Sequence, residues 1–191
     1  MLSELPFPMP VLETQRLRLR RFEQRDLEAG FAWASDEEVT RYVYWPAHRT
    51  LNDTQNFLNS CFREYSQKGV GPWAMVLKDS GEQIGNCSFG LIHAADSRIE
   101  IAYFLARHHW GKGLACEAVT ELLRFGFEDL QANRMEARCM IANTASERVM
   151  QKAGMTYEGI LREFVHAKGK FHDLKVYSVL RHEWLTRKAS G

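Results

Sequence analysis

Hydrophobic and polar residues alternate with a period of two over several short stretches of the chain. Around Leu17 and Leu19 the intervening positions are arginines, an alternation typical of a half-buried strand. Other stretches rich in β-branched and aromatic residues lie between turn residues such as Asp79-Ser80-Gly81, which also predicts strands. Seven strands are predicted in this way, at residues 16–20, 73–77, 84–92, 98–105, 134–141, 157–166 and 171–180.

Apolar residues at helical spacing predict helices between these strands. The clearest stretch begins at Leu114 and runs to about Phe127, with Ala118, Val119 and Leu122 on one face. Further helices are predicted at residues 26–33, 51–65 and 143–153. Strands and helices interleave without strict alternation. The pattern therefore predicts an α/β (α+β) fold with one mixed sheet flanked by helices.

Length and composition fit one globular domain. The chain has 191 residues, of which 45% are hydrophobic, with five Trp and eleven Phe. Such a chain can bury a core, which excludes disordered and collagen-like classes. Its net charge is +1, and a nearly neutral chain has no general attraction for polyanions. We therefore expect no stable binding of nucleic acid.

Other features bear on compartment and on metals. No apolar run approaches the roughly 18 residues of a membrane span, and the first ten residues do not resemble a secretion signal. We therefore expect no membrane association. The four cysteines are scattered without a Cys-x-x-Cys pair, which favours a reducing, cytoplasmic location. His108 and His109 are adjacent and no His-Glu-x-x-His motif exists. Because neighbouring residues on a helix or strand do not face one ion, we expect no metal site.

The glycine turn Gly111-Lys112-Gly113 stands between a predicted strand and the helix from Leu114. Free N–H groups and the dipole at a helix start favour anions such as a pyrophosphate. A P-loop would require Ser or Thr where Gly113 stands, and a dinucleotide fingerprint would require glycine at Cys116. On these residues alone, a tight strand-to-helix turn without a ligand is an equally good interpretation.

Separated motifs elsewhere occur in a characteristic order. They are Leu12-Glu13-Thr14-x-Arg16-Leu17-x-Leu19-Arg20, Trp110-Gly111-Lys112-Gly113, Asn143-x-x-Ser146-x-x-Val149, Glu158-Gly159-x-Leu161-Arg162 and Asp173 through Tyr177. Together they resemble the GNAT superfamily of acyl-CoA N-acyltransferases. More narrowly they resemble the RimJ/RimL-type branch, whose best-known members acetylate N-termini of ribosomal proteins.

The resemblance implies a domain organisation and a detailed fold. It covers about residues 11–185, which leaves residues 1–10 as an N-terminal extension and residues 186–191 as a C-terminal tail. The GNAT fold implied is a single mixed, mostly antiparallel, seven-stranded sheet flanked by helices. Its central pair of parallel strands is splayed.

The resemblance also implies acetyl-CoA as cosubstrate, with no metal. Its pyrophosphate would bind, mainly through backbone N–H groups, a loop consisting of Trp110, Gly111, Lys112, Gly113, Leu114, Ala115 and Cys116. The superfamily pattern is Gln/Arg-x-x-Gly-x-Gly/Ala, and Trp110 departs from it in a way common in this branch. Pantetheine would lie between strands 100–105 and 134–141. A backbone N–H near Phe104 or Leu105 would hold the acetyl carbonyl, and Asn143 would reach the pantetheine arm besides capping its helix.

Two residues are candidates for catalysis. Acetyl transfer to an amine requires removal of a proton, and Glu100 is the candidate base, with a salt-bridged strand carboxylate as the alternative and His93 as a weaker base. Many GNAT enzymes carry a tyrosine acid seven residues after the asparagine, where this chain has Met150. Ser146 matches a position thought to assist the thiolate in this branch. Its alternative role is a first-turn serine that bonds the backbone.

The acceptor is the least defined partner. Tyr42, Tyr44 and Trp45 are the candidate acceptor-binding residues, by cation–π contact, and core packing is the alternative. The acceptor would be a protein N-terminus or a small primary amine. A non-catalytic acyl-CoA-binding regulatory module is the alternative function, and the presence of Glu100 argues against it. Family members are often monomers or dimers, and a homodimer is the expectation adopted.

Overall fold

One eight-stranded sheet organises the chain. The computed structural model describes residues 8–189. The strands are β1 (Leu12–Glu13), β2 (Leu17–Arg21), β3 (Trp73–Leu77), β4 (Gln83–His93), β5 (Arg98–Leu105), β6 (Arg134–Met140), β7 (Thr156–Ala167) and β8 (Lys170–Leu180). Their order in the sheet is β1-β2-β3-β4-β5-β6-β8-β7. All neighbours are antiparallel except β5 and β6, which are parallel. The prediction of a mixed, mostly antiparallel sheet is confirmed.

The strand count of seven was too low by one. Each predicted strand is present, and the additional strand is β1, whose two residues pair with β2 through Leu12 opposite Leu19. Two residues are too few to produce a period-two pattern, so the sequence alone could not reveal this strand.

Six α-helices accompany the sheet within residues 8–189. They are α1 (Leu27–Ala34), α2 (Glu37–Thr40), α3 (Leu51–Lys68), α4 (Leu114–Arg124), α5 (Thr144–Lys152) and α6 (Arg181–Ala189). Helix α4 ends earlier than predicted because a π-helical turn, Phe125–Asp129, follows it. Helix α6 was not predicted. It has no buried residue, and Trp184 attaches it by stacking on Phe127 with ring centroids 5.7 Å apart. None of the helices within residues 8–189 has the length and apolar character needed to cross a bilayer.

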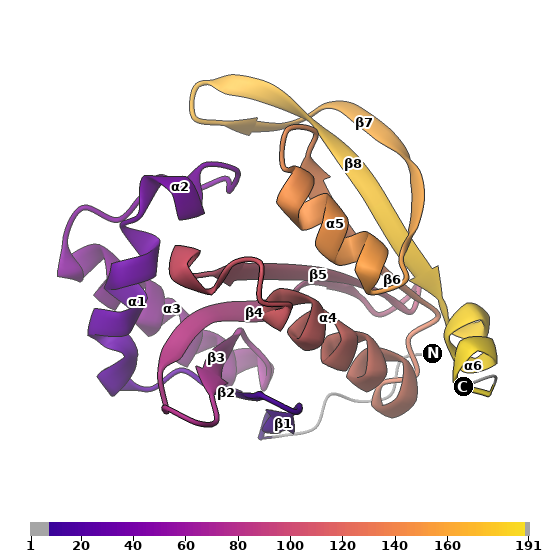
Figure 1. Cartoon of the computed structure of the whole chain (residues 1–191), viewed down its shortest axis with the longest axis horizontal. Coiled ribbons are helices and arrows are strands. Elements are labelled where there is room, and N and C mark those ends of the chain that lie inside the picture. Colours follow the sequence, from indigo (N-terminus) through magenta and orange to yellow (C-terminus); the bar gives the residue numbers. More distant parts are fainter. Residues whose placement is uncertain (1–7, 190–191) are drawn as a thin grey trace.

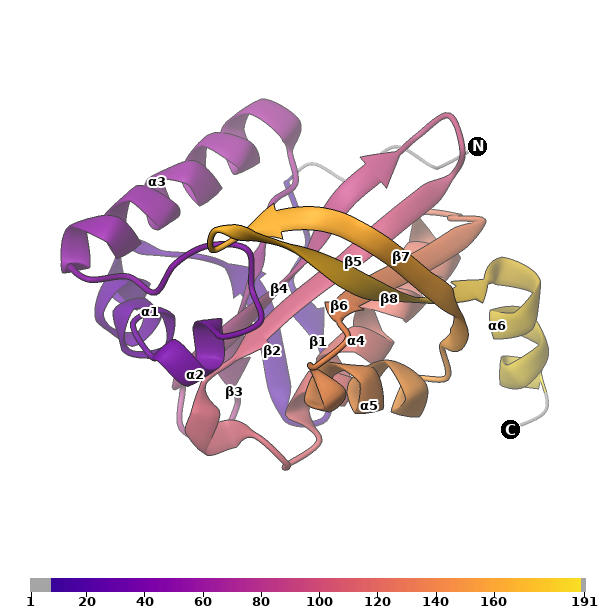
Figure 2. The same ribbon diagram turned by 90° about the horizontal axis from the view of Figure 1, so that it is seen from above.

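The helices cover the sheet from both sides. Figure 2 shows α3 on one side of the strands and α4 with α5 on the other, while the β7–β8 hairpin arches across the molecule. Helices α1, α2 and α3 gather at one end, away from α6 and the C-terminus (Figure 1). This arrangement leaves the end of β5 between the two helical groups.

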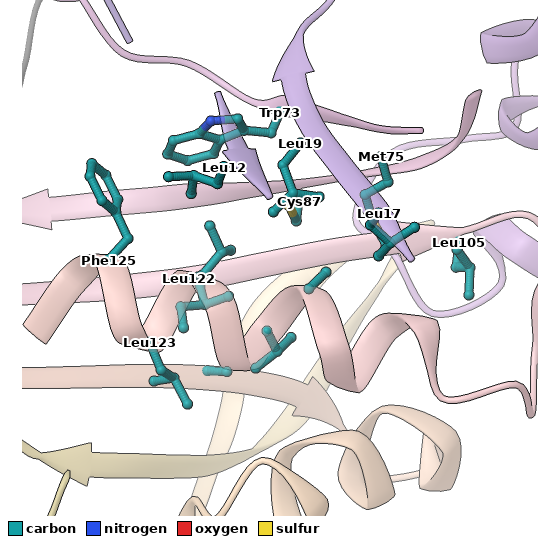
Figure 3. Close-up of a cluster of buried hydrophobic side chains, with 14 of the residues drawn as sticks. Leu12, Leu17, Leu19, Trp73, Met75, Cys87, Leu105, Leu122, Leu123 and Phe125 are labelled. Carbon is teal, nitrogen blue, oxygen red and sulfur yellow. The ribbon is translucent and has the colours of Figure 1, made fainter. Parts of the chain in front are cut away.

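The main core lies between α4 and the first strands. Figure 3 shows Leu122 of α4 and Phe125 of the following π-helical turn directed toward Leu17, Leu19 and Trp73 of the sheet. Leu17, Leu19, Trp73 and Leu122 are fully buried. Burying one large apolar side chain contributes about 1.5–3 kcal/mol. The core therefore fixes α4 on the sheet, and with it the glycine turn from which α4 begins.

The parallel pair β5–β6 separates part-way along its length. The two strands pair from Arg98 with Arg134 as far as Ile101 with Ala137. Beyond that point β5 pairs with β4 only, and β6 pairs with β8 only. The splayed central pair is thus confirmed, and it leaves main-chain groups of both strands facing a common gap.

Candidate active site

A cavity of about 480 Å³ lies where the glycine turn, the end of β5 and the start of α5 meet. A volume of this size suits a small molecule or one end of a larger one. Ten of the predicted cofactor-binding residues line it, namely Phe104, Leu105, Trp110, Gly111, Gly113, Leu114, Ala115, Cys116, Asn143 and Ser146, and the predicted acceptor residue Tyr42 does so as well. Tyr44, Trp45, Glu100 and Lys112 are not part of this lining.

Two glycines shape the turn that enters α4. Gly111 and Gly113 have φ angles of 75° and 80°, a left-handed conformation that other residues adopt only with strain. The first intrahelical bond is donated by Glu117 N to Gly113 O at 3.0 Å. The earlier N–H groups of the helix have no intrahelical acceptor, and the helix dipole adds positive charge beside them. The turn therefore has the donors that a pyrophosphate requires.

An ion-paired cluster holds this turn from outside. Glu117 of α4 accepts hydrogen bonds from the backbone N and the Nε of Arg16, each at 2.7 Å, and from Thr14 Oγ1 at 2.5 Å. Arg16 Nη1 donates to the carbonyl of Lys112 at 2.9 Å. We call Thr14, Arg16 and Glu117 the clamp. Through it, the start of the sheet fixes both the helix and the carbonyl of Lys112.

Beyond Ile101, strands β5 and β6 separate, and we call the gap between them the splay. Every second backbone N–H group of β5 faces this gap. Ala106 N donates to Ile84 O of β4 at 2.8 Å. Because hydrogen-bonding groups alternate sides along a strand, Phe104 also faces β4, while Tyr103 and Leu105 face the gap toward β6. The indole Nε1 of Trp110 donates to Leu105 O at 2.7 Å. Trp110 therefore attaches the turn to the end of β5.

Tyr103 is a candidate that the sequence did not single out. Its hydroxyl lies 2.8 Å from Ser146 Oγ and donates to Ser146 O at 3.1 Å. Burial raises the pKa of Tyr103, so the phenol stays protonated near neutral pH. Ser146 N donates to Asn143 Oδ1 at 3.0 Å, which confirms Asn143 as the cap of α5. Met150, at the position of the missing tyrosine acid, is fully buried.

Glu100 lies on the face of β5 opposite to that of Tyr103. It is 21% exposed, and its nearest cationic partner is Arg138 Nη1 at 3.6 Å. Arg138 is bound more closely by Glu136, at 2.6 Å from Nη2. Burial raises the pKa of Glu100, an effect that the charge of Arg138 only partly opposes. The raised pKa agrees with a role of Glu100 as a base, and the contact with Arg138 agrees with a salt-bridged strand carboxylate.

The predicted acceptor residues separate into different surroundings. Tyr42 lines the cavity at the splay. Trp45 packs edge-on against Phe104, with ring centroids 5.8 Å apart. Burial, and then the negative charge of Glu100, raises the pKa of Tyr44, which does not line the cavity. The three residues therefore do not form one aromatic cage.

The two adjacent histidines do converge, contrary to the expectation from their adjacency. Both lie in the 3-10 turn Arg107–His109. The Nε2 atoms of His108 and His109 lie 3.1 and 3.2 Å from the same Glu82 oxygen. These hydrogen bonds lower the pKa of Glu82. The tight turn directs successive side chains toward one carboxylate, which a regular helix or strand does not do.

Comparison with known proteins identifies this constellation. Residues 16–156 match the model of the protein family described as the acetyltransferase (GNAT) domain. The chain belongs to the GNAT acetyltransferase family. Uncharacterized N-acetyltransferase p20 of Bacillus licheniformis is 34% identical over 177 residues, which are 92% of this chain and 99% of that protein. The putative ribosomal N-acetyltransferase YdaF of Bacillus subtilis is 26% identical over 174 residues, 89% and 94% of the two chains.

A solved structure agrees with these relatives. The crystal structure of a GNAT-family acetyltransferase from Bacillus anthracis superposes with a TM-score of 0.81 at 29% identity, covering 91% of this chain and 100% of that one. This protein is therefore a GNAT N-acetyltransferase, and its similarity to YdaF agrees with the resemblance to the RimJ/RimL-type branch. The turn, the splay and the start of α5 fit the acetyl-CoA that this resemblance implies, because they supply anion donors and unpaired strand edges around one cavity.

Proposed function

We propose that this GNAT protein transfers the acetyl group of acetyl-CoA to a primary amine by direct attack within a ternary complex. The observation that supports this most strongly is the common cavity of the glycine turn, the splayed strand edge and the start of α5. In this proposal the pyrophosphate binds the N–H groups that follow Gly111 and Gly113. Pantetheine pairs with the free edge of β5, an edge-strand mode of recognition, and Asn143 contacts its arm.

The chemical step forms an amide and breaks the thioester. The amine nitrogen attacks the acetyl carbon, the amine gives one proton to a base, and CoA leaves as a thiolate that takes up a proton. The carbonyl oxygen becomes negative during attack. An N–H facing the splay, from Tyr103 or Leu105, would stabilise that charge, and one such donor contributes about 3–4 kcal/mol. The pairing of Phe104 with β4 favours Leu105 over Phe104 for this role.

Glu100 is the proposed base, acting through water. It lies three residues before Tyr103, about 10 Å along an extended strand. An extended glutamate side chain spans roughly half of that separation, so one bridging water is required. The raised pKa of Glu100 brings its basicity closer to that needed near neutral pH.

Ser146 is the proposed hydrogen-bond donor to the departing thiolate. Its Oγ lies 2.8 Å from the Tyr103 hydroxyl. When the single phenol hydrogen turns from Ser146 O to Ser146 Oγ, the serine hydroxyl is free to donate its own hydrogen to sulfur. In this arrangement Tyr103 and Ser146 together would take over the function of the tyrosine that is missing at position 150.

The acceptor, the assembly and the boundaries are further parts of the proposal. The likeness to a putative ribosomal N-acetyltransferase supports a protein N-terminus, whereas a small amine is supported by the cavity of about 480 Å³ that Phe104 lines. We also propose a homodimer, a cytoplasmic location in keeping with four free cysteines, and a domain at about residues 11–185. Met9 is buried and α6 reaches Ala189, so contacts continue past both boundaries. Residues 1–7 and 190–191 lie outside the described part.

An acetyl-CoA consumption assay tests this function. Purified protein is incubated with acetyl-CoA and a panel of small amines and N-terminal peptides, and free thiol is measured. Thiol release that depends on an amine supports the transferase. Binding of CoA without thiol release from any acceptor would instead favour the regulatory module. Absence of CoA binding in calorimetry would contradict both functions.

A further inference from the structure

Three side chains with metal-binding atoms converge beside the glycine turn. Glu82 lies between β3 and β4, and His108 and His109 belong to the 3-10 turn that follows β5. One donor atom from each residue, two imidazole nitrogens and a carboxylate oxygen, lies within 4.8 Å of the other two. We call these three residues the His–Glu cluster. Within residues 8–189 it is the only group of three or more histidines, cysteines or carboxylates with this property.

The spacing of the donor atoms fits a tetrahedral metal ion. The Nε2 atoms of His108 and His109 lie 3.1 and 3.2 Å from Glu82 Oε1. Zinc binds nitrogen at about 2.0–2.1 Å and carboxylate oxygen at about 2.0–2.2 Å, so two of its tetrahedral ligands are about 3.3–3.5 Å apart. A small outward shift of the side chains would therefore place all three atoms around one ion.

The chemistry of the donors agrees with their spacing. Both histidines approach the same carboxylate oxygen instead of one oxygen each, and their ring centroids lie only 4.1 Å apart. Imidazole and carboxylate together suit zinc and the neighbouring transition metals. In the part of the chain that the structure describes, Glu82 forms ion pairs only with these two histidines. No lysine or arginine there competes with an ion for the carboxylate.

The His–Glu cluster combines one buried ligand with two accessible ones. The side chain of His109 is 7% exposed, whereas those of Glu82 and His108 are 44% and 67% exposed. Burial fixes the position of the first imidazole, and the exposed partners leave a path for an ion from solvent. Three protein ligands leave a fourth position for water, unlike the closed set of a structural zinc site. We therefore expect an ion that exchanges with the solvent.

The His–Glu cluster is continuous with the wall of the acetyl-CoA cavity. His109 lines that cavity. The next residue, Trp110, donates its backbone N–H to Arg107 O at 3.0 Å and its indole N–H to Leu105 O at 2.7 Å. The 3-10 turn and the glycine turn therefore form one connected segment. An ion would attach this segment to Glu82, which is 26 residues before His108 in the chain.

We propose that the His–Glu cluster binds one divalent transition-metal ion of the zinc class, which cross-links the glycine turn to the turn between β3 and β4. The ligands are Glu82 Oε1 and the Nε2 atoms of His108 and His109. Each imidazole is then neutral with its proton on Nδ1, and a water occupies the fourth position. The ion takes no part in the bonds made and broken during acetyl transfer. It holds the turn in one conformation, which reduces the entropy that acetyl-CoA binding would otherwise cost.

Titration of zinc into the protein without a histidine tag, against a coloured chelator, measures this affinity. We expect a single site with a micromolar Kd. In Glu82→Gln the amide oxygen still accepts hydrogen bonds from both histidines, but a neutral amide is a poor ligand for zinc. This variant should raise the Kd about 100-fold or more, because even a partner that only orients a ligand contributes about 10–100-fold. His182→Gln is the control, since this exposed histidine of α6 lies outside the His–Glu cluster.

A second variant covers the case in which Glu82→Gln fails to fold. His108 is largely exposed, so His108→Gln should leave the core intact and still lose tight zinc binding. A wild type that binds no zinc, or zinc binding that is equally tight in both variants, would overturn the inference. Magnesium is the comparison ion, because it requires oxygen ligands. Equal affinities for magnesium and zinc would also overturn the inference, since imidazole ligands must favour zinc.

Coupling to acetyl-CoA is measured by calorimetry without any turnover. Saturating zinc should lower the Kd of acetyl-CoA several-fold, and acetyl-CoA should tighten zinc binding by the same factor, because linkage is reciprocal. Loss of this effect in His108→Gln supports the cross-link. Zinc binding with an unchanged Kd of acetyl-CoA would overturn it. Zinc binding by a protein that acetylates no amine supports the His–Glu cluster and contradicts only the transferase proposal.

Discussion

The clamp formed by Thr14, Arg16 and Glu117 leads to a prediction about acetyl-CoA affinity. Replacing Glu117 with alanine removes the acceptor of four donor groups, one of them a backbone N–H. Arg16 would then lose the contact that directs its guanidinium to the carbonyl of Lys112. The turn would keep the bond from Trp110 to Leu105 but lose its link to the start of the sheet. Its N–H groups would then sample several orientations before binding the pyrophosphate.

The size of the effect follows from exposure and charge. Hydrogen bonds to charged groups contribute about 1.5–3 kcal/mol when buried, but the Arg16 side chain is 46% exposed and that of Glu117 16%. Solvent screening therefore reduces the whole cluster to about 2 kcal/mol. Loss of a negative charge near the phosphates acts in the opposite direction. It is worth only about 0.5 kcal/mol for charges roughly 8 Å apart in water. The loss of the clamp contacts should therefore outweigh the loss of the negative charge, and the affinity for acetyl-CoA should fall.

We therefore expect Glu117→Ala to raise the Kd of acetyl-CoA by about tenfold, equivalent to about 1.4 kcal/mol. The turnover number at saturating acetyl-CoA should change little, because the clamp does not touch the reacting atoms. Isothermal calorimetry and steady-state kinetics measure the two quantities. Glu121→Ala is the matched control, since Glu121 lies one turn further along α4 and pairs with Arg124 instead. A Glu117 variant that is less stable but binds acetyl-CoA as the wild type does would refute the reasoning.

Three further predictions concern protons. Tyr103→Phe should lower kcat about tenfold with little change in the acetyl-CoA Kd, because Ser146 loses its hydroxyl partner; stopped-flow thiol release measures this. The rate should fall as pH drops through the raised pKa of Glu100, and that acidic limb should be absent from the pH–rate profile of Glu100→Gln. The hydrogen bond from Arg134 lowers the pKa of Glu158 to about 2, so its contribution to stability is complete above the ordinary value of about 4.3 and is lost as pH falls toward 2. Urea unfolding of wild type and Glu158→Gln should therefore differ at neutral pH and converge in acid.

Each of these predictions has a clear contrary result. Tyr103→Phe with wild-type kcat would remove Tyr103 from the proton path. An unchanged acidic limb in Glu100→Gln would assign that limb to another group. A stability difference between wild type and Glu158→Gln that is the same at pH 2.5 and pH 7 would mean that Arg134 does not stabilise the ionised carboxylate.

The sequence by itself determined most of the elements and the position of the glycine turn. The alternation around Leu17 and Leu19 and the helical spacing after Leu114 express local periodicities that burial preserves. The two glycines of the turn specify a backbone conformation that few other residues adopt. Family motifs in order then indicated GNAT membership, which the match over residues 16–156 confirms.

Only the tertiary structure decided which side chains meet. Tyr103 and Ser146 lie 43 residues apart, Arg16 and Glu117 101 apart, and Asn86 faces Phe104 through strand register. Such contacts depend on sheet order, helix placement and the tight turn that joins His108 and His109 to Glu82, none of which leaves a local pattern in the chain. Sequence periodicity reports which face of an element is buried, but the partner of that face is set by long-range packing.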